Sequence, residues 1–242
     1  MKKTINFLAF LIIPITAQAS LITGVLNITG TVNLTTGGIA FGASHQFSIN
    51  SPSSSQQGGF TAFAGSTGSI DDITNPPGAM NVPDFMNFAV APNISITLTL
   101  LDPGIDGSSG CTATPAAAGQ VCTPAQSPFD FQNTSATTGT ATFNIEGLEA
   151  DSTTSATILV SGVFTIPLNE SFQQLLSTIQ GSGTVTSSFS ASLATESNPP
   201  PPPSVPEPNT WTSLAIGAAG IFLLRLSRQP RCATGCGNPT VL

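Results

Sequence analysis

Between residues 21 and 196, apolar and polar side chains alternate in short stretches that glycine, proline, asparagine and serine separate. From Ile94 to Leu100 every second residue is Ile or Leu, and the residues between them are Ser or Thr. This period of two places the apolar side chains on one face of a β-strand and the hydroxyl groups on the other. The pattern predicts strands over residues 21–29, 38–49, 94–101, 140–148, 156–168 and 184–195.

One stretch has the spacing of a short amphipathic helix. It follows a possible cap at Asn169 or Ser171 and ends at Gly181. Its apolar residues, at positions i, i+3, i+4 and i+7, are Phe172, Leu175, Leu176 and Ile179. Many short strands with a single helical period favour an antiparallel sheet. The sequence therefore predicts an all-β ectodomain, an antiparallel β-sandwich or jelly roll, with the helix covering an open end.

Residues 50–93 are less regular, because clustered serines, paired glycines and a Pro-Pro-Gly group mark loops there. Four phenylalanines of this region are expected to pack into the core: Phe60, Phe63, Phe85 and Phe88.

The first nineteen residues have the pattern of a secretory signal peptide. Lys2 and Lys3 precede an apolar run over residues 5–15, and the small residues Ala17 and Ala19 follow it. Signal peptidase requires small residues at these two positions, so the mature chain is expected to begin at Ser20, outside the cytoplasm. The alternative, a buried amino-terminal helix, does not account for the small residues.

The last 45 residues have three parts. Residues 198–208 form a proline-rich, extended spacer, residues 209–226 are predominantly apolar, and residues 227–242 form a polar tail. As a helix, residues 209–226 span roughly 27 Å against a hydrocarbon core of about 30 Å, so a membrane crossing is just feasible. A buried core helix is the alternative, but the run lacks a polar face. The basic residues after it place the tail in the cytoplasm and the main domain outside.

The charged residues are distributed very unevenly. All five basic residues lie at positions 2, 3, 225, 228 and 231, whereas the twelve acidic residues lie between Asp71 and Glu207. Binding to nucleic acid or to anionic lipid needs Lys and Arg, so we exclude both for the central region. The chain has no Tyr, one Trp and one His, His45, which we interpret as a strand residue. We therefore predict no enzyme, no catalytic residues and no cofactor.

The carboxyl-terminal features occur in a recognisable order. Residues Val205, Pro206, Glu207 and Pro208 follow the proline run, the apolar stretch starts near Trp211, and Arg225 and Arg228 close it. This order resembles the PEP-CTERM sorting domain of Gram-negative and related bacteria. Asn209 stands where Ser or Ala is commoner in that family, and the tail continues past the Arg cluster.

The resemblance implies processing by exosortase, a membrane-embedded thiol transpeptidase-like enzyme. Pro206, Glu207 and Pro208 are then recognised as substrate residues. The family is associated with exopolysaccharide and the biofilm matrix, so the resemblance implies exopolysaccharide as a partner beside signal peptidase and exosortase. The resemblance implies a protein that is held in the inner membrane before processing and reaches the cell surface or extracellular matrix afterwards.

The four cysteines fall into two pairs. Cys111 and Cys122 lie in one loop-like segment of the exported region, where we predict a disulfide. A zinc site would need more ligands than these. Cys232 and Cys236 lie in the predicted cytoplasmic tail, where reduced thiols and lipidation are the two alternatives.

Three groups of acidic residues are candidate calcium ligands, but we interpret them as turn or solvated loop residues and predict no metal site. They are Asp102 with Asp106, Asp71 with Asp72, and Glu146 with Glu149 and Asp151. The sequence thus predicts a non-enzymatic surface protein. An extracellular calcium- or glycan-binding module is the alternative, and a secreted hydrolase is a third.

Overall fold

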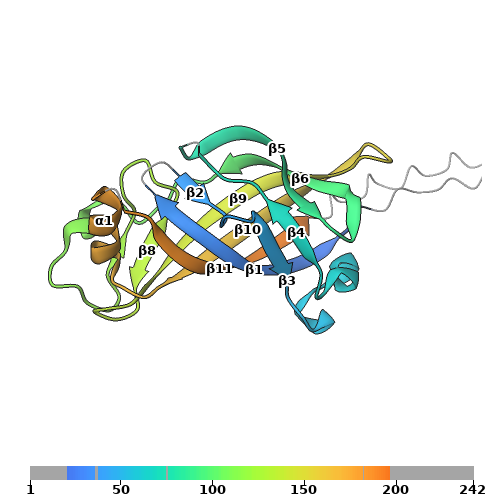
Figure 1. The fold of residues 1–242 in the computed structure, drawn as a ribbon. Helices are drawn as coiled ribbons and strands as arrows, with labels where there is room; N and C mark the ends of the chain where they lie inside the picture. Colours follow the sequence, from blue (N-terminus) through green and yellow to red (C-terminus); the bar gives the residue numbers. More distant parts are fainter. Residues whose placement is uncertain (1–20, 36–37, 75, 182, 197–242) are drawn as a thin grey trace, which may run out of the picture. The chain divides into compact units, whose positions relative to one another are not determined.

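The computed structural model describes residues 21–35, 38–74, 76–181 and 183–196 (Figure 1). The predicted signal peptide, proline-rich spacer, membrane helix and tail lie outside these ranges. None of the helices in these ranges has the length and hydrophobicity of a membrane span. The strands are β1 (Gly24–Thr35), β2 (Gly38–Ala40), β3 (Gln46–Ile49), β4 (Thr67–Ile70), β5 (Gly78–Phe88), β6 (Ala91–Leu101), β7 (Val121–Cys122), β8 (Asp130–Asn133), β9 (Gly139–Asp151), β10 (Ala156–Leu168) and β11 (Val185–Glu196).

The main strands form one closed antiparallel barrel. Its order is β10-β11-β1-β3-β4-β5-β6-β9, and β9 pairs back with β10 over the whole of that strand. Strands β7 and β8 extend the sheet beyond β9, and β2 pairs with β1. The all-β, antiparallel prediction is confirmed. The sandwich prediction is not confirmed. Strand β10, the first in this order, pairs with β11 and also with β9, the last, so the described strands form a closed ring instead of two facing sheets.

Alternation along the strands fills the barrel with aromatic side chains. In β9 every second residue, from Gly139 to Asp151, is buried. The rings of Phe143 and Phe164, which belong to neighbouring strands, stack with centroids 4.7 Å apart. The predicted burial of Phe60, Phe63, Phe85 and Phe88 is confirmed.

A glycine makes room for one of these rings. Gly30 of β1 pairs with Phe47 on one side and with Phe189 on the other. A Cβ atom on Gly30 would lie 2.5 Å from the Phe189 ring, so any larger residue would displace that ring.

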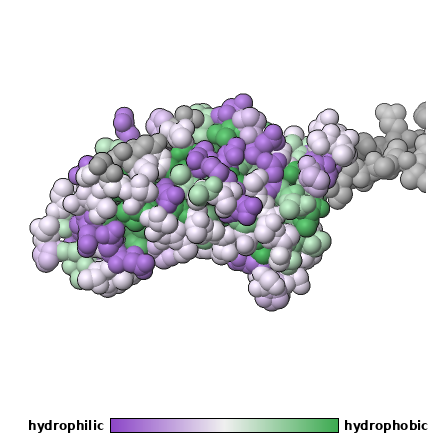
Figure 2. Space-filling view, viewed as in Figure 1, coloured by the Kyte–Doolittle hydropathy of each residue, from purple (hydrophilic) through white to green (hydrophobic). Residues whose placement is uncertain are grey.

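The outer wall is rich in hydroxyl groups and poor in charge. Exposed side chains of β1 and β11 face each other in pairs, for example Thr29 with Ser190 and Thr31 with Ser188. The face in Figure 2 is accordingly pale, with scattered polar and apolar patches. Short hydroxyl side chains keep the wall hydrated without the Lys and Arg that this region lacks.

The two ends of the barrel are closed differently. At one, which we call the α1 end, lie helix α1 (Phe172–Gln180) and β8 (Figure 1). The predicted cap is confirmed, since the Ser171 hydroxyl accepts a hydrogen bond from the Gln174 amide at 3.4 Å. At the other, the hairpin end, lie the β9–β10 turn and the 3-10 turn over Gly58–Phe63.

Both ends of the described chain meet at the hairpin end. Gly24, where β1 begins, pairs with Thr195, where β11 finishes, and the Thr195 hydroxyl accepts a hydrogen bond from the Gly24 amide at 2.8 Å. The chain therefore enters and leaves the barrel at the same rim.

Candidate functional site

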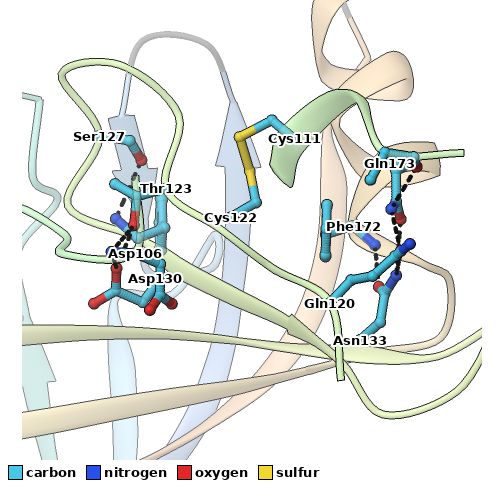
Figure 3. The surroundings of a disulfide bond; sticks show 12 residues. Asp106, Cys111, Gln120, Cys122, Thr123, Ser127, Asp130, Asn133, Phe172 and Gln173 are labelled. Carbon is cyan, nitrogen blue, oxygen red and sulfur yellow. Dashed lines mark hydrogen bonds between the residues drawn. A yellow bond between two sulfur atoms is a disulfide. The ribbon is translucent and has the colours of Figure 1, made fainter. Parts of the chain in front are cut away.

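The predicted disulfide is confirmed at the α1 end (Figure 3). Cys111 lies in a 3-10 turn over Ser109–Thr112 and Cys122 lies in β7, with their Cα atoms 4.9 Å apart. Cys122 is fully buried. The bridge therefore fixes the long connection between β6 and β8 to the barrel.

On one side of the disulfide, Asp130 holds two segments of this connection together. One oxygen of its carboxylate accepts hydrogen bonds from the amides of Ile105 and Asp106, at 2.7 and 3.2 Å, and from the hydroxyl of Thr123. Gly104 must be small here, because a Cβ atom on it would lie 2.8 Å from the same oxygen. Asp106, a predicted turn residue, thus contributes its backbone to the Asp130 cluster.

On the other side, three amide side chains join the same connection to α1 (Figure 3). Asn133 is buried, and its amide nitrogen donates to Gln120 and Gln173 at 3.2 and 2.9 Å. Its oxygen accepts from the Phe172 amide, 3.0 Å away, at the first turn of the helix, where backbone amides have no partner within the helix. The disulfide segment and the helix are therefore held against β8 as one cap.

This cap and the barrel rim line a cavity of about 390 Å³ that opens to solvent. Proline, glutamine, serine and phenylalanine of residues 124–129 form one wall, and none of the described residues lining the cavity is ionisable. Its apolar wall includes Leu34, Ile39, Ile73, Leu101, Phe131 and Ile179. The volume lies within the range of small-molecule sites in proteins.

The hairpin end holds a buried acid. Glu149 of β9 is fully buried, and its Oε1 atom accepts a hydrogen bond from the Ile22 amide at 3.0 Å. Its Oε2 atom has no hydrogen-bond partner in the part of the chain that the structure describes. Burial raises the pKa of the Glu149 carboxyl from 4.5 to about 7, with the Ile22 hydrogen bond opposing this and the charge of Asp151 adding to it.

The neighbouring acid, Asp151, is in the opposite state. Hydrogen bonds from the Thr153 hydroxyl at 2.7 Å, the Asn93 amide at 3.1 Å and the Thr153 backbone at 2.8 Å lower the pKa of its carboxyl to about 2. Asp151 is therefore charged at neutral pH, two residues from a carboxyl that is half neutral.

Of the other residues singled out in the sequence, the structure brings His45 and Asp72 together. His45 precedes β3 in a left-handed turn (φ 49°), so its predicted strand position is wrong, and its Nδ1 lies 3.4 Å from an oxygen of Asp72. Asp72 also accepts from the Phe41 amide at 2.8 Å. Glu146 is exposed on the outer face of β9. Among the described residues, no group of three His, Cys, Asp or Glu could hold a metal ion.

Several predicted residues lie outside the described ranges. They are the cleavage residues Ala17, Ala19 and Ser20, the sorting residues Val205, Pro206, Glu207, Pro208, Trp211, Arg225 and Arg228, and the cysteines Cys232 and Cys236. No protein-family model matches the chain, and comparison with curated proteins and with solved structures found no match.

Sequence reasoning missed the buried position of Glu149 and the cavity. The alternation of β9 could have placed Glu149, since Phe143, Ile145 and Glu149 share one face of the strand. The cavity gives no comparable signal, because its walls come from segments far apart in the chain.

The raised pKa of Glu149 predicts a stability that falls with pH. In the full chain from Met1, the folded state keeps this proton to about pH 7 whereas the unfolded state loses it near pH 4.5. The contribution of Glu149 to stability is therefore fully present below pH 4.5 and is lost as the pH rises to about 7, a fall of on the order of 3 kcal/mol. We expect Glu149→Gln to remove this loss, as measured by urea unfolding between pH 4 and 8.5.

The control is Glu146→Gln, the same change at an exposed position of the same strand, which should leave the pH profile as it is. A Glu149→Gln profile that falls as steeply as that of the parent chain would contradict the prediction.

The disulfide predicts a second loss. Cys111 and Cys122 are separated by 11 positions in the sequence. Replacing both with serine frees this loop in the unfolded chain, so we expect the free energy of unfolding to fall by roughly 3 kcal/mol. Urea unfolding measures this. The paired changes Cys232→Ser and Cys236→Ser are the control and should have no effect; equal midpoints for both double variants would rule the expectation out.

Proposed function

We propose that this chain is a non-enzymatic, exported protein of the cell surface or extracellular matrix, sorted through a carboxyl-terminal PEP-CTERM-like signal. The observation that carries the proposal is the order of three features after the barrel. A proline-rich segment contains Val205-Pro206-Glu207-Pro208, an apolar run follows over residues 209–226, and an arginine cluster closes it.

Two features of the described domain support export. A disulfide persists in oxidising compartments, and Cys111–Cys122 links two parts of the connection between β6 and β8. The last strand ends at Glu196, directly before the spacer begins at residue 198. The barrel core therefore does not require the sorting segment.

In this proposal exosortase recognises Pro206, Glu207 and Pro208 in an extended segment. Prolines fix the backbone beforehand, so little conformational entropy is lost when the segment enters an enzyme's cleft. The apolar run holds the precursor in the membrane, and processing transfers the domain to the surface or matrix, where exopolysaccharide is the proposed partner. A calcium- or glycan-binding role for the domain is the alternative that this proposal keeps.

The cavity favours a second candidate function, the binding of a small uncharged ligand. Its lining combines aliphatic and aromatic side chains with a few hydroxyl and amide groups, and it carries no ionisable group among the described residues. A charged ligand would lose its hydration there without gaining a counter-charge, whereas an apolar one gains by burial.

The sorting proposal predicts the effect of Glu207→Ala. In a bacterium that has exosortase, we expect the variant to remain unprocessed at its carboxyl end while the signal peptide is still removed, because only the recognition motif has changed. Intact mass of the membrane and surface fractions shows which end is present.

Asn209→Ala is the matched control, since alanine is common at that position of the family and processing should continue. Retention of residues 225–242 in the parent chain, both in that host and in one without exosortase, would refute exosortase processing.

The cavity predicts binding of an apolar fluorescent probe such as N-phenyl-1-naphthylamine. Leu176→Trp should fill part of the cavity and weaken binding roughly tenfold, because about 1.4 kcal/mol of apolar burial is lost. Thr178→Trp places the same ring on the exposed face of α1 and should leave affinity unchanged. Fluorescence titration compares the two; equal affinities would place the probe elsewhere.

A further inference from the structure

The buried Glu149 carboxyl lacks a positive partner. Ile96 of β6 and Ile158 of β10 flank it as pairing neighbours, and Asp151 is the titratable group that acts on it. No Lys or Arg occurs between residues 4 and 224, and His45, the single histidine, contacts Asp72. Leaving a buried carboxylate without a counter-charge destabilises the fold.

The first residues of the domain lead directly to this carboxyl. The Ile22 amide donates to Glu149, and the Gly59 amide donates to the Thr23 carbonyl at 2.9 Å. The Gln57 amide donates to the Val25 carbonyl, also at 2.9 Å. A Cβ atom on Gly24 would lie 2.0 Å from the Gln57 carbonyl oxygen, so the two segments are in close backbone contact. The amino-terminal backbone is thus fixed as far as Ile22.

The predicted cleavage site is two residues before Ile22. Hydrolysis of the Ala19–Ser20 peptide bond consumes one water and gives a carboxylate on Ala19 and an α-amino group on Ser20, which takes up a proton at neutral pH. Two residues span at most about 7 Å, so this ammonium group is made within reach of Glu149.

We infer that the α-ammonium group of Ser20, created by signal-peptide cleavage, binds the buried Glu149 carboxylate. The inference rests on the proposed export and on cleavage after Ala19. Oε2, the buried oxygen without a partner, is the acceptor that the ammonium group would satisfy. The Asp151 carboxylate already accepts hydrogen bonds from Asn93 and Thr153. Its negative charge therefore attracts the ammonium group, while Glu149 accepts the hydrogen bond from it.

The pairing would make the domain complete only after cleavage. Before cleavage the Ser20 nitrogen is an uncharged amide, and Glu149 must give up its charge or remain unpaired in the barrel. Afterwards both groups are charged and paired. The loss of stability between pH 4.5 and about 7 that is expected for the full chain should therefore be absent from the mature chain.

The sequence offers a selective probe of this group. Cleavage removes Lys2 and Lys3 and the rest of the chain has no lysine, so the α-amino group is the only primary amine from Ser20 to Leu242. The mature chain can be made by cutting a fusion protein directly before Ser20 and kept in detergent. Reductive methylation with ¹³C-formaldehyde then places one NMR probe on that nitrogen and keeps its charge.

We expect the α-amino group to titrate with a pKa of about 9 in the parent chain, against about 8 for a free terminus. Glu149→Gln should return the pKa to about 8, whereas the exposed Glu146→Gln should leave it near 9. The same pKa in the parent and in Glu149→Gln would overturn the inference.

A second measurement needs no substitution. Acetylating the α-amino group removes its charge, so the thermal midpoint of the parent chain should fall at pH 8 and change much less at pH 5, where Glu149 is neutral without a partner. An acetylation effect that is equal at both pH values would also overturn the pairing. Amino-terminal sequencing of exported protein tests cleavage after Ala19 separately, so failure of the pairing and failure of the proposed export give different results.

Discussion

Strand β10 hydrogen-bonds to β9 along its whole length and to β11 over Leu159–Thr165, and this double pairing closes the sheet. Closure leaves one interior, which phenylalanine side chains fill, and it leaves no free edge among the strands of the barrel path. Functional groups on the described domain can therefore lie only on the outer wall or at the two ends. The cavity and the buried acid lie at those ends.

The lack of Lys and Arg shapes the rest of the domain. Hydroxyl side chains hydrate the wall, and Asp130 and Asp151 obtain their partners from backbone amides, hydroxyl groups and an asparagine. Each of these carboxylates is satisfied by hydrogen bonds instead of by ion pairs. Glu149 lacks such a set, because the barrel interior around it presents hydrocarbon and Asp151.

Local patterns predicted much of the fold. Alternation gave β10 its observed bounds, 156–168, and the i, i+3, i+4 spacing with Ser171 predicted α1. Strand β5 was missed because register shifts interrupt its pairing with β6 and Asp84 has a positive φ, so its apolar residues do not alternate. Closure was missed for another reason: a barrel and a sandwich need the same alternation, and only long-range pairing separates them.

The candidate sites divide in the same way. The disulfide followed from two cysteines close together in the sequence, whereas the cavity needs the β1–β2 hairpin, the segment before β5, the disulfide connection and α1 in one place. Glu149 was named, but as a solvated loop residue, because the predicted strand ended at residue 148, whereas β9 continues with the same alternation to Asp151.

The pairing of Gly24 with Thr195 brings the two ends of the domain to one rim. A domain with adjacent ends can be inserted into a loop of a host protein, or exchanged between carriers, without stretching its chain. The cavity lies at the far rim, so such a graft would leave it open to solvent. The barrel can therefore be transferred as a unit, and its binding properties can be examined on any host protein that offers two neighbouring attachment points.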